Sequence, residues 1–188
     1  MGGRRQASER RGRRSIRHPN HDYSQPAAYF VTICAEGRAR RFGTVSGGEL
    51  RLNDAGRAVA AVWLSLPERF PQVGIDAFVV MPDHFHGIVL VREPLGDSTP
   101  EALRSAARSR WPHALGDIVG AFKSLSTYAY AAGVREQGWQ PFERRLWQRN
   151  FHERWIRNGW QLRTVRRYIL ANPSNWGKPR ALRFRRSR

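Results

Sequence analysis

The chain has 188 residues, 40% of them hydrophobic and 11% aromatic, which is enough for one domain with a buried core, and its formal net charge is +18. Its single cysteine, Cys34, excludes an intrachain disulfide framework and fits a reducing compartment. No apolar stretch approaches the ~18 residues of a membrane span, and the Arg-rich start lacks the apolar segment of a secretory signal. We therefore expect a soluble, cytoplasmic protein with no membrane partner.

The positive charge is concentrated at the two ends of the chain. Residues 1–20 contain seven Arg and one Glu, and residues 178–188 contain five Arg and one Lys. This distribution predicts a disordered basic arm at 1–20, a folded domain at 21–177 and a basic tail at 178–188. Such tails suit a polyanion, because each phosphate that they neutralise releases counterions. A solubilising arm would have the same composition.

The first half of the folded domain alternates strands with one helix. An N-cap at Asn53 or Asp54 opens a helix that runs to Arg69, with apolar residues at helical spacing and Pro71 after it. Before the helix, apolar runs predict one strand followed by a hairpin around a Ser-Gly-Gly turn, at 29–35, 42–45 and 49–52.

The next predicted hairpin contains a pair of histidines. Its strands are residues 75–80 and 85–91, and Pro and Asp at 82–83 form the turn. Because alternate side chains of a strand share a face, His84 and His86 point to the same side. Two imidazoles on one face can chelate a metal ion. A polar strand face with two ordinary histidines would give the same pattern.

The second half of the domain is predicted to hold two helices. Residues 93–116 are rich in Pro, Ser, Ala and Arg, which indicates a surface excursion with room for a short helix after Thr99. A helix then runs from an Asp117 cap to Arg135, and its apolar stripe is Ile118, Phe122, Leu125 and Ala129. A short strand at 146–148 and a last helix over 161–172, stopped by Pro173, complete the chain.

This order of elements favours an α+β fold. Strands joined by short turns indicate an antiparallel sheet, with the helices against one face, and argue against a doubly wound parallel sheet. In the last helix, Tyr168 and Asn172 are four residues apart and so share a face. Tyr168 also suits a packing aromatic beside Ile169, and Asn172 suits an ordinary helix C-terminus.

Five separated segments resemble the REP-associated tyrosine transposases, which belong to the single-tyrosine HUH transposases that act on single-stranded DNA. The segments occur in the same order in the family, and the resemblance runs from residue 16 to residue 176. They are PAAYFVTI (26–33), VMPDHFHGI (80–88), FKS (122–124), WQRN (147–150) and YILANP (168–173).

The resemblance implies a ferredoxin-like antiparallel sheet with packed helices and a DNA strand-transfer site. In such a site His84 and His86 bind Mg²⁺ or Mn²⁺, Tyr168 attacks the DNA, and Asn172 is a third ligand or a polar neighbour. An ion held by two imidazoles and one oxygen keeps positions open for phosphate oxygens. A 5′-phosphotyrosine retains the bond energy that rejoining needs. The expected partner is single-stranded or hairpin DNA, and the protein would be a monomer or homodimer associated with the bacterial nucleoid.

Several basic and aromatic residues are candidates for holding the DNA. Tyr128 and Tyr130 suit core packing or base stacking, and His152 suits a structural role or a phosphate contact. The start of the last helix, with Asn158 and no acidic residue, departs from the family and is less favourable to the helix dipole. A solvated basic face would look the same as the predicted DNA contacts, which are Lys123, Arg149, Arg163, Arg166 and Arg167.

Three functions follow from these residues. The first is a strand transferase that nicks and rejoins single-stranded DNA at hairpins of palindromic repeats. The second is a module that binds hairpin DNA or structured RNA without catalysis. The third is a metal-dependent phosphodiesterase that uses water, for which the sequence offers no separate general base.

Overall fold

A four-stranded antiparallel sheet forms the centre of the protein. The computed structural model describes residues 27–92 and 115–178. The arm predicted at 1–20, nearly all of the tail at 178–188 and most of the excursion at 93–116 lie outside the described residues. The sheet has the order β4-β5-β1-β6, and its strands are β1 (Ala27–Cys34), β4 (Val73–Met81), β5 (His84–Val91) and β6 (His152–Ile156).

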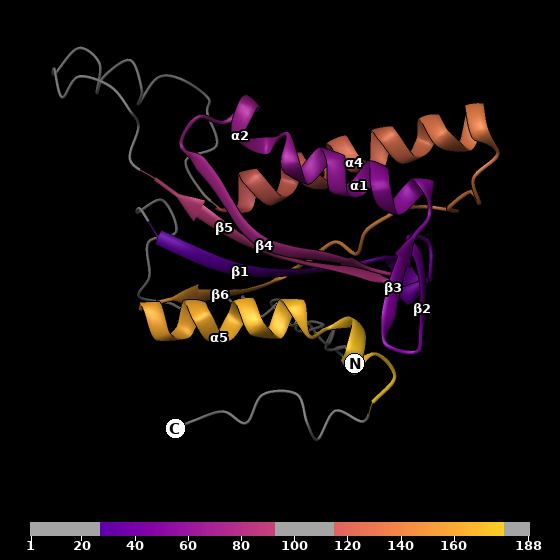
Figure 1. The fold of residues 1–188 in the computed structure, drawn as a ribbon. Coiled ribbons are helices and arrows are strands. Elements are labelled where there is room, and N and C mark those ends of the chain that lie inside the picture. Colours follow the sequence, from indigo (N-terminus) through magenta and orange to yellow (C-terminus); the bar gives the residue numbers. More distant parts are fainter. Residues whose placement is uncertain (1–26, 93–114, 179–188) are drawn as a thin grey trace, which may run out of the picture.

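Helices lie on both faces of this sheet. Helices α1 (Asp54–Leu64), α2 (Leu66–Arg69) and α4 (Leu115–Gln137) cover one face, and α5 (Gly159–Leu170) covers the other (Figure 1). The sheet and its two crossover helices follow the order β1-α1-β4-β5-α4-β6, which is the ferredoxin-like pattern. This confirms the predicted α+β class. The prediction that the helices pack against one face is wrong, because α5 lies on the opposite side.

The sheet is buried on both faces because its central strands alternate two sets of apolar residues. On one side, Tyr29, Val31 and Phe85 join a core with residues of α1 and α4. On the other side, a smaller cluster holds α5 against the sheet and consists of Ile88, Ile156, Val165 and Ile169. A second, two-stranded sheet pairs β2 (Gly43–Ser46) with β3 (Glu49–Leu52), close to the predicted hairpin.

The helix predicted from Asn53 to Arg69 is divided into two. Asn53 caps α1 as predicted, since its side-chain oxygen accepts the N–H of Gly56 at 2.9 Å. Pro67 has no N–H to donate to Trp63, and its ring would clash with that carbonyl in a continuous helix. Helix α1 therefore ends at Leu64, and α2 starts after Ser65.

Helix α4 begins earlier than predicted, and its buried row is different. Asp117 lies inside its first turn. The residues that α4 buries include Ser126 and Tyr130, whereas the predicted Leu125 and Ala129 are only partly buried. Ser126 is a tolerated core residue because its hydroxyl donates to the Phe122 carbonyl at 2.6 Å and accepts the indole N–H of Trp147 at 2.9 Å.

The prediction of a strand at 146–148 is wrong, because these residues form no strand. Trp147 forms only a single bridge with Ala35, and the strand at this edge of the sheet is β6. The last helix starts two residues before its predicted start. Asn158 caps it by accepting the N–H of Gln161 at 2.9 Å, so a side-chain cap stabilises a helix start that has no acidic residue.

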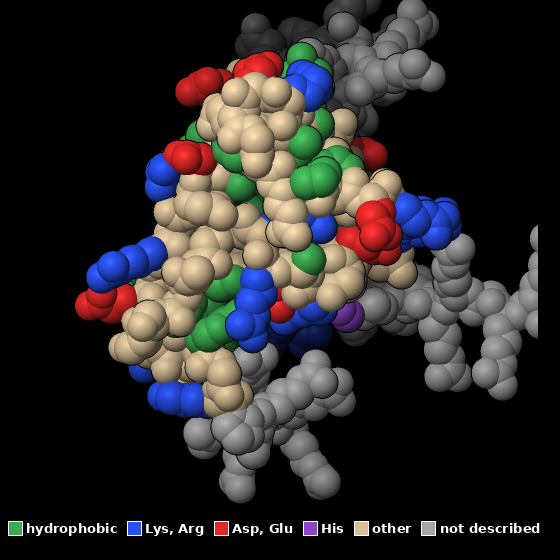
Figure 2. All heavy atoms as spheres, turned by 90° about the vertical axis from the view of Figure 1, so that its right-hand side faces the viewer, with side chains coloured by type: hydrophobic (Ala, Val, Ile, Leu, Met, Phe, Trp, Pro, Cys, Tyr) green, Lys and Arg blue, Asp and Glu red, His purple; other side chains and the backbone are tan. Residues whose placement is uncertain are grey.

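Short 3-10 turns follow β1 and α5, at η1 (Glu36–Arg38) and η2 (Pro173–Asn175). No described helix is long and apolar enough to cross a membrane. On the face at the β2–β3 end of the molecule, Lys and Arg side chains lie at several separate places with Asp and Glu among them (Figure 2).

Candidate active site

Polar side chains occupy one half of the sheet face that α5 covers. Thr32 of β1 lies directly between His86 of β5 and His152 of β6 in the strand register, and Cys34 lies opposite His84. Directly opposed residues point to the same face. The other half of this face carries the apolar cluster that binds α5.

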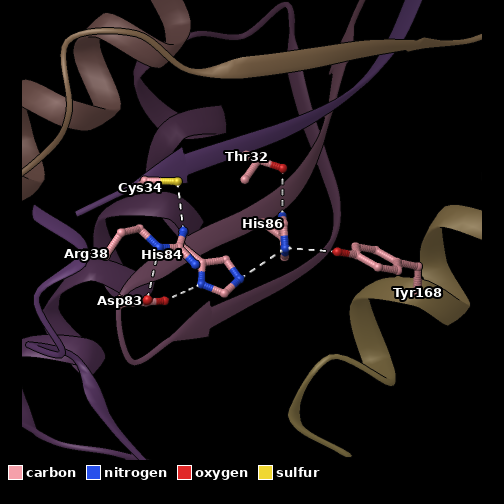
Figure 3. Close-up of polar contacts among 7 residues, drawn as sticks. All are labelled: Thr32, Cys34, Arg38, Asp83, His84, His86 and Tyr168. Atoms are coloured by element: carbon pink, nitrogen blue, oxygen red, sulfur yellow. Dashed lines mark hydrogen bonds and ion pairs between the residues drawn. The ribbon is translucent and has the colours of Figure 1, made fainter. Parts of the chain in front are cut away.

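The two histidine side chains converge on each other. His84 Nε2 and His86 Nε2 are 3.1 Å apart, and both residues are buried, with 4% and 5% exposure (Figure 3). The His84 Nδ1–H donates to Asp83 Oδ1 at 2.5 Å, because an ionised carboxylate only accepts. The His86 Nδ1 lies 2.8 Å from Thr32 Oγ1. Each Nδ1 atom thus has an oxygen partner. The two Nε2 atoms, which are the inner nitrogens of the pair, face one point.

Tyr168 lies beside this pair. Its hydroxyl oxygen is 3.5 Å from His86 Nε2, which confirms the predicted proximity of the helix tyrosine and the histidines (Figure 3). The ring of Phe30 packs edge-on against Tyr168 at 5.8 Å and lies 5.2 Å from the His86 ring. These two ring contacts and the polar contact to His86 place the hydroxyl of α5 at the histidine pair.

A cavity of about 670 Å³ opens in front of these residues, large enough for part of a nucleotide chain. Tyr168, both histidines and Cys34 line it. Sequence reasoning did not assign the other lining residues to the site, or left them undecided in the case of His152; they are Phe30, Thr32, Arg38, His152, Glu153, Arg154 and Val165. Arg38 donates through Nε to Asp83 Oδ2 at 3.0 Å and through Nη1 to Cys34 Sγ at 2.9 Å. Arg154 could have been found only by recognising β6, where it lies opposite Phe30.

Trp176 is a further neighbour of the site that sequence reasoning missed. Its ring stacks on His84, with centroids 5.9 Å apart and planes 18° from parallel, and the Arg40 guanidinium lies 5.7 Å from the Trp176 centroid. Asn172, the predicted third ligand, is buried at 8% exposure just after α5 but is not among the residues that line the cavity. Its predicted role stays a prediction.

The histidine pair fits a small divalent cation. Two ligands at right angles, each about 2.1 Å from one ion, are about 3.0 Å apart, close to the 3.1 Å between the two Nε2 atoms. The carboxylate behind His84 is the usual support of a metal-binding imidazole. Within residues 27–92 and 115–178, no group of three His, Cys, Asp or Glu side chains is arranged to share an ion.

Comparisons with known proteins place this geometry in context. No protein-family model matches the chain. An uncharacterized protein of Haemophilus influenzae is 35% identical over 168 residues, which cover 87% of this chain and 89% of the relative. The chain belongs to the same family as that protein. A solved structure described as a REP-associated tyrosine transposase bound to a REP hairpin has a TM-score of 0.54 and 22% identity, covering 86% of this chain and 74% of that one. This chain therefore has the fold of a REP-associated tyrosine transposase.

Two of the predicted DNA contacts lie together outside the cavity. Lys123 of α4 donates through Nζ to the carbonyls of Gln148 and Arg149, at 2.6 and 2.9 Å. Its half-burial, reinforced by the charge of Arg145, lowers the pKa of the Lys123 amine. Lys123 thus ties α4 to the chain before β6. The Arg149 side chain is exposed and lines a separate groove of about 330 Å³.

The other three predicted DNA contacts are exposed residues of α5. Arg166 forms a two-point ion pair with Asp76 of β4, through Nε at 2.9 Å and Nη2 at 2.5 Å. The hydrogen bond from Arg166, helped by the backbone N–H of Ala77, holds the pKa of Asp76 below its ordinary value. The hydrogen bond to Asp76 and its negative charge raise the pKa of Arg166. Arg166 therefore fastens α5 to the sheet. Neither Arg163 nor Arg167 is among the residues that line the cavity.

Proposed function

We propose that the protein is a metal-dependent DNA strand transferase that nicks and rejoins single-stranded DNA at hairpins. The fold supports the proposal, because it is shared with a REP-associated tyrosine transposase bound to a REP hairpin. One observation carries it further than the fold. The Tyr168 hydroxyl lies 3.5 Å from a histidine pair whose inner nitrogens are 3.1 Å apart, in an open cavity.

Tyr168 is the proposed nucleophile. Its oxygen attacks the phosphorus of one linkage, a bond forms between that oxygen and phosphorus, and the bond from phosphorus to the 3′ oxygen breaks. The phenol loses a proton and the departing 3′ oxygen gains one. The products are a 5′-phosphotyrosine and a free 3′-hydroxyl. Because the phosphodiester energy is conserved in the tyrosyl ester, attack by a 3′-hydroxyl restores a DNA strand without ATP.

His84 and His86 are the proposed metal ligands. A bound Mg²⁺ or Mn²⁺ would act as a Lewis acid on the scissile phosphate and orient it. Asp83 and Thr32 hold the two rings so that the inner nitrogens stay directed into the cavity. Arg154, at the cavity wall, adds positive charge where the strand would lie. Phe30 packs edge-on against the Tyr168 ring and also contacts the His86 ring, which holds the tyrosine beside the histidine.

Labelled hairpin oligonucleotides test the proposal. The purified protein is incubated with 5′- and 3′-labelled hairpins and Mn²⁺, and covalent adducts are resolved on denaturing gels. We expect an adduct on the fragment with the 5′ phosphate and a free 3′-hydroxyl on the other. Tyr168→Phe should abolish the adduct and leave hairpin binding intact. Tyr128→Phe is the matched control, since Tyr128 is 73% exposed on α4 and is absent from the cavity lining.

The outcomes separate the three functions. An adduct that persists in Tyr168→Phe would remove Tyr168 as nucleophile. Hairpin binding with no covalent product at any divalent metal would identify a binding module. Multiple turnover that survives the loss of Tyr168 would identify a phosphodiesterase that uses water. Chelation of the metal with EDTA should stop adduct formation and allow binding to continue if the histidine pair serves catalysis.

A further inference from the structure

The backbone of η1 holds Arg38 in a conformation that arginine rarely adopts. Its φ is +56°, and it is the one non-glycine residue with positive φ among those the structure describes. Gly37 before it has φ +61°. In this left-handed region a Cβ atom meets the following carbonyl, so the backbone alone favours Gly or Asn. An unfavourable conformation of this kind persists where the surrounding structure fixes it, often at a functional site.

The turn is fastened on both sides to the neighbourhood of the histidines. The Ala35 N–H donates to the Asp83 carbonyl at 2.9 Å. After the turn, the N–H groups of Arg41 and Phe42 both donate to the Pro82 carbonyl, at 2.8 and 3.1 Å. Pro82 and Asp83 form the turn between β4 and β5. These hydrogen bonds join η1 to the turn that precedes His84 and bring the Arg38 side chain over Asp83.

The Arg38 side chain begins a chain of contacts that reaches the metal-facing nitrogens. The guanidinium donates to Asp83 Oδ2 at 3.0 Å, and the other carboxylate oxygen accepts from His84 Nδ1 at 2.5 Å (Figure 3). His84 then presents Nε2 to His86 at 3.1 Å. Asp83 is buried, with 7% exposure, whereas 44% of the Arg38 side chain is exposed. A buried carboxylate needs such a partner, because desolvation disfavours its charge.

We propose that Arg38 is a positioning residue that fixes His84, one of the two proposed metal ligands, through Asp83. This inference rests on the proposed function, in which His84 and His86 bind the ion. With Arg38 in place, one carboxylate oxygen is committed to the guanidinium and the other to His84, so the His84 ring has one orientation. Without Arg38, the Asp83 carboxylate loses its cation and is free to turn away, and His84 loses the support that orients Nε2.

Manganese binding tests this role without DNA or catalysis. Binding of Mn²⁺ alone is measured from the loss of the free-ion electron paramagnetic resonance signal. Arg38→Gly removes the side chain and accepts the backbone conformation, so we expect it to fold and to bind Mn²⁺ roughly 10-fold more weakly than the wild type. Arg38→Asn tolerates the same backbone and takes its place if the glycine variant does not fold. Arg57→Ala is the control, because Arg57 pairs with Asp54 on the exposed surface of α1.

A double-mutant cycle separates a positioning role from a direct one. Asp83→Asn should weaken Mn²⁺ binding by roughly 10 to 100-fold. If Arg38 acts through Asp83, the variant that carries both substitutions binds no more weakly than Asp83→Asn alone. Additive losses would overturn the role through Asp83. Equal affinity of the wild type and Arg38→Gly would overturn the inference on Arg38 alone, whereas a wild type that binds no Mn²⁺ would overturn the metal site of the proposed function.

Discussion

Ile169 and Leu170 are neighbours in α5 with opposite environments, and replacing each by alanine tests how the helix that carries Tyr168 is held. Ile169 is fully buried in the cluster between α5 and the sheet, and Leu170 is 72% exposed. Ile169→Ala removes three carbons, worth about 2.4 kcal/mol at about 0.8 kcal/mol each. The cavity left behind adds to this, so we expect a loss of about 3 to 4 kcal/mol in the free energy of unfolding. For Leu170→Ala we expect a change within about 0.5 kcal/mol.

Urea denaturation followed by tryptophan fluorescence measures both values. A loss of 3 to 4 kcal/mol leaves a domain of ordinary stability, about 5 to 15 kcal/mol, largely folded, so adduct formation can be measured on the same samples. A looser α5 should also slow the proposed adduct formation, since a displacement of about 1 Å can cost about 100-fold in rate. Equal unfolding free energies for the two variants would refute the docking of α5 through Ile169.

Two further predictions concern the sheet beneath the site. Because its ion pair lowers the pKa of Asp76, the stability from the pair is present above the ordinary value of 3.8 and is lost as pH falls through the lowered pKa. The melting temperatures of the wild type and Asp76→Asn, measured by calorimetry, should therefore differ at pH 7 and converge as pH falls below 3.8. Gly87→Ala should cost about 1 to 3 kcal/mol in urea denaturation and shift His86, since its Cβ would lie 2.7 Å from the Trp63 ring. Gly74→Ala is its control, because the added atom would meet the flexible end of Arg92, and a cost as large as that of Gly87→Ala would contradict the packing argument.

Local sequence patterns could predict the parts of the site that lie within one element. The alternation of a strand places His84 and His86 on one face, and the structure has both side chains buried there. Val165 and Ile169 are four residues apart in α5, so they share a face, and both are buried. These patterns succeed because the residues involved are close in sequence and their geometry is set by one backbone conformation.

The elements that the sequence did not predict depend on distant partners. The sequence HERWI of β6 carries little apolar signal, because the strand pairs with β1 alone at the sheet edge. A β-bulge between Ile75 and Phe78 interrupts the register where Asp76 meets Arg166 of α5. The helix propensity of α5 carries no information on which face of the sheet it covers. That choice follows from the second apolar set of the strands, which includes Ile88 and Ile156.

Arg38 illustrates why a site residue can lie outside any motif. Nothing in its sequence neighbourhood separates it from the other arginines that make up most of the net charge of +18. Its distinction arises only when the hydrogen bonds of η1 to the β4–β5 turn place it over a buried carboxylate that already supports His84. The hydrogen bonds that hold η1 against the β4–β5 turn thus also place a cation behind the carboxylate that contacts His84. A substitution that loosens η1 should therefore weaken the proposed metal binding more than it lowers the stability of the sheet, whose apolar cores do not include Arg38.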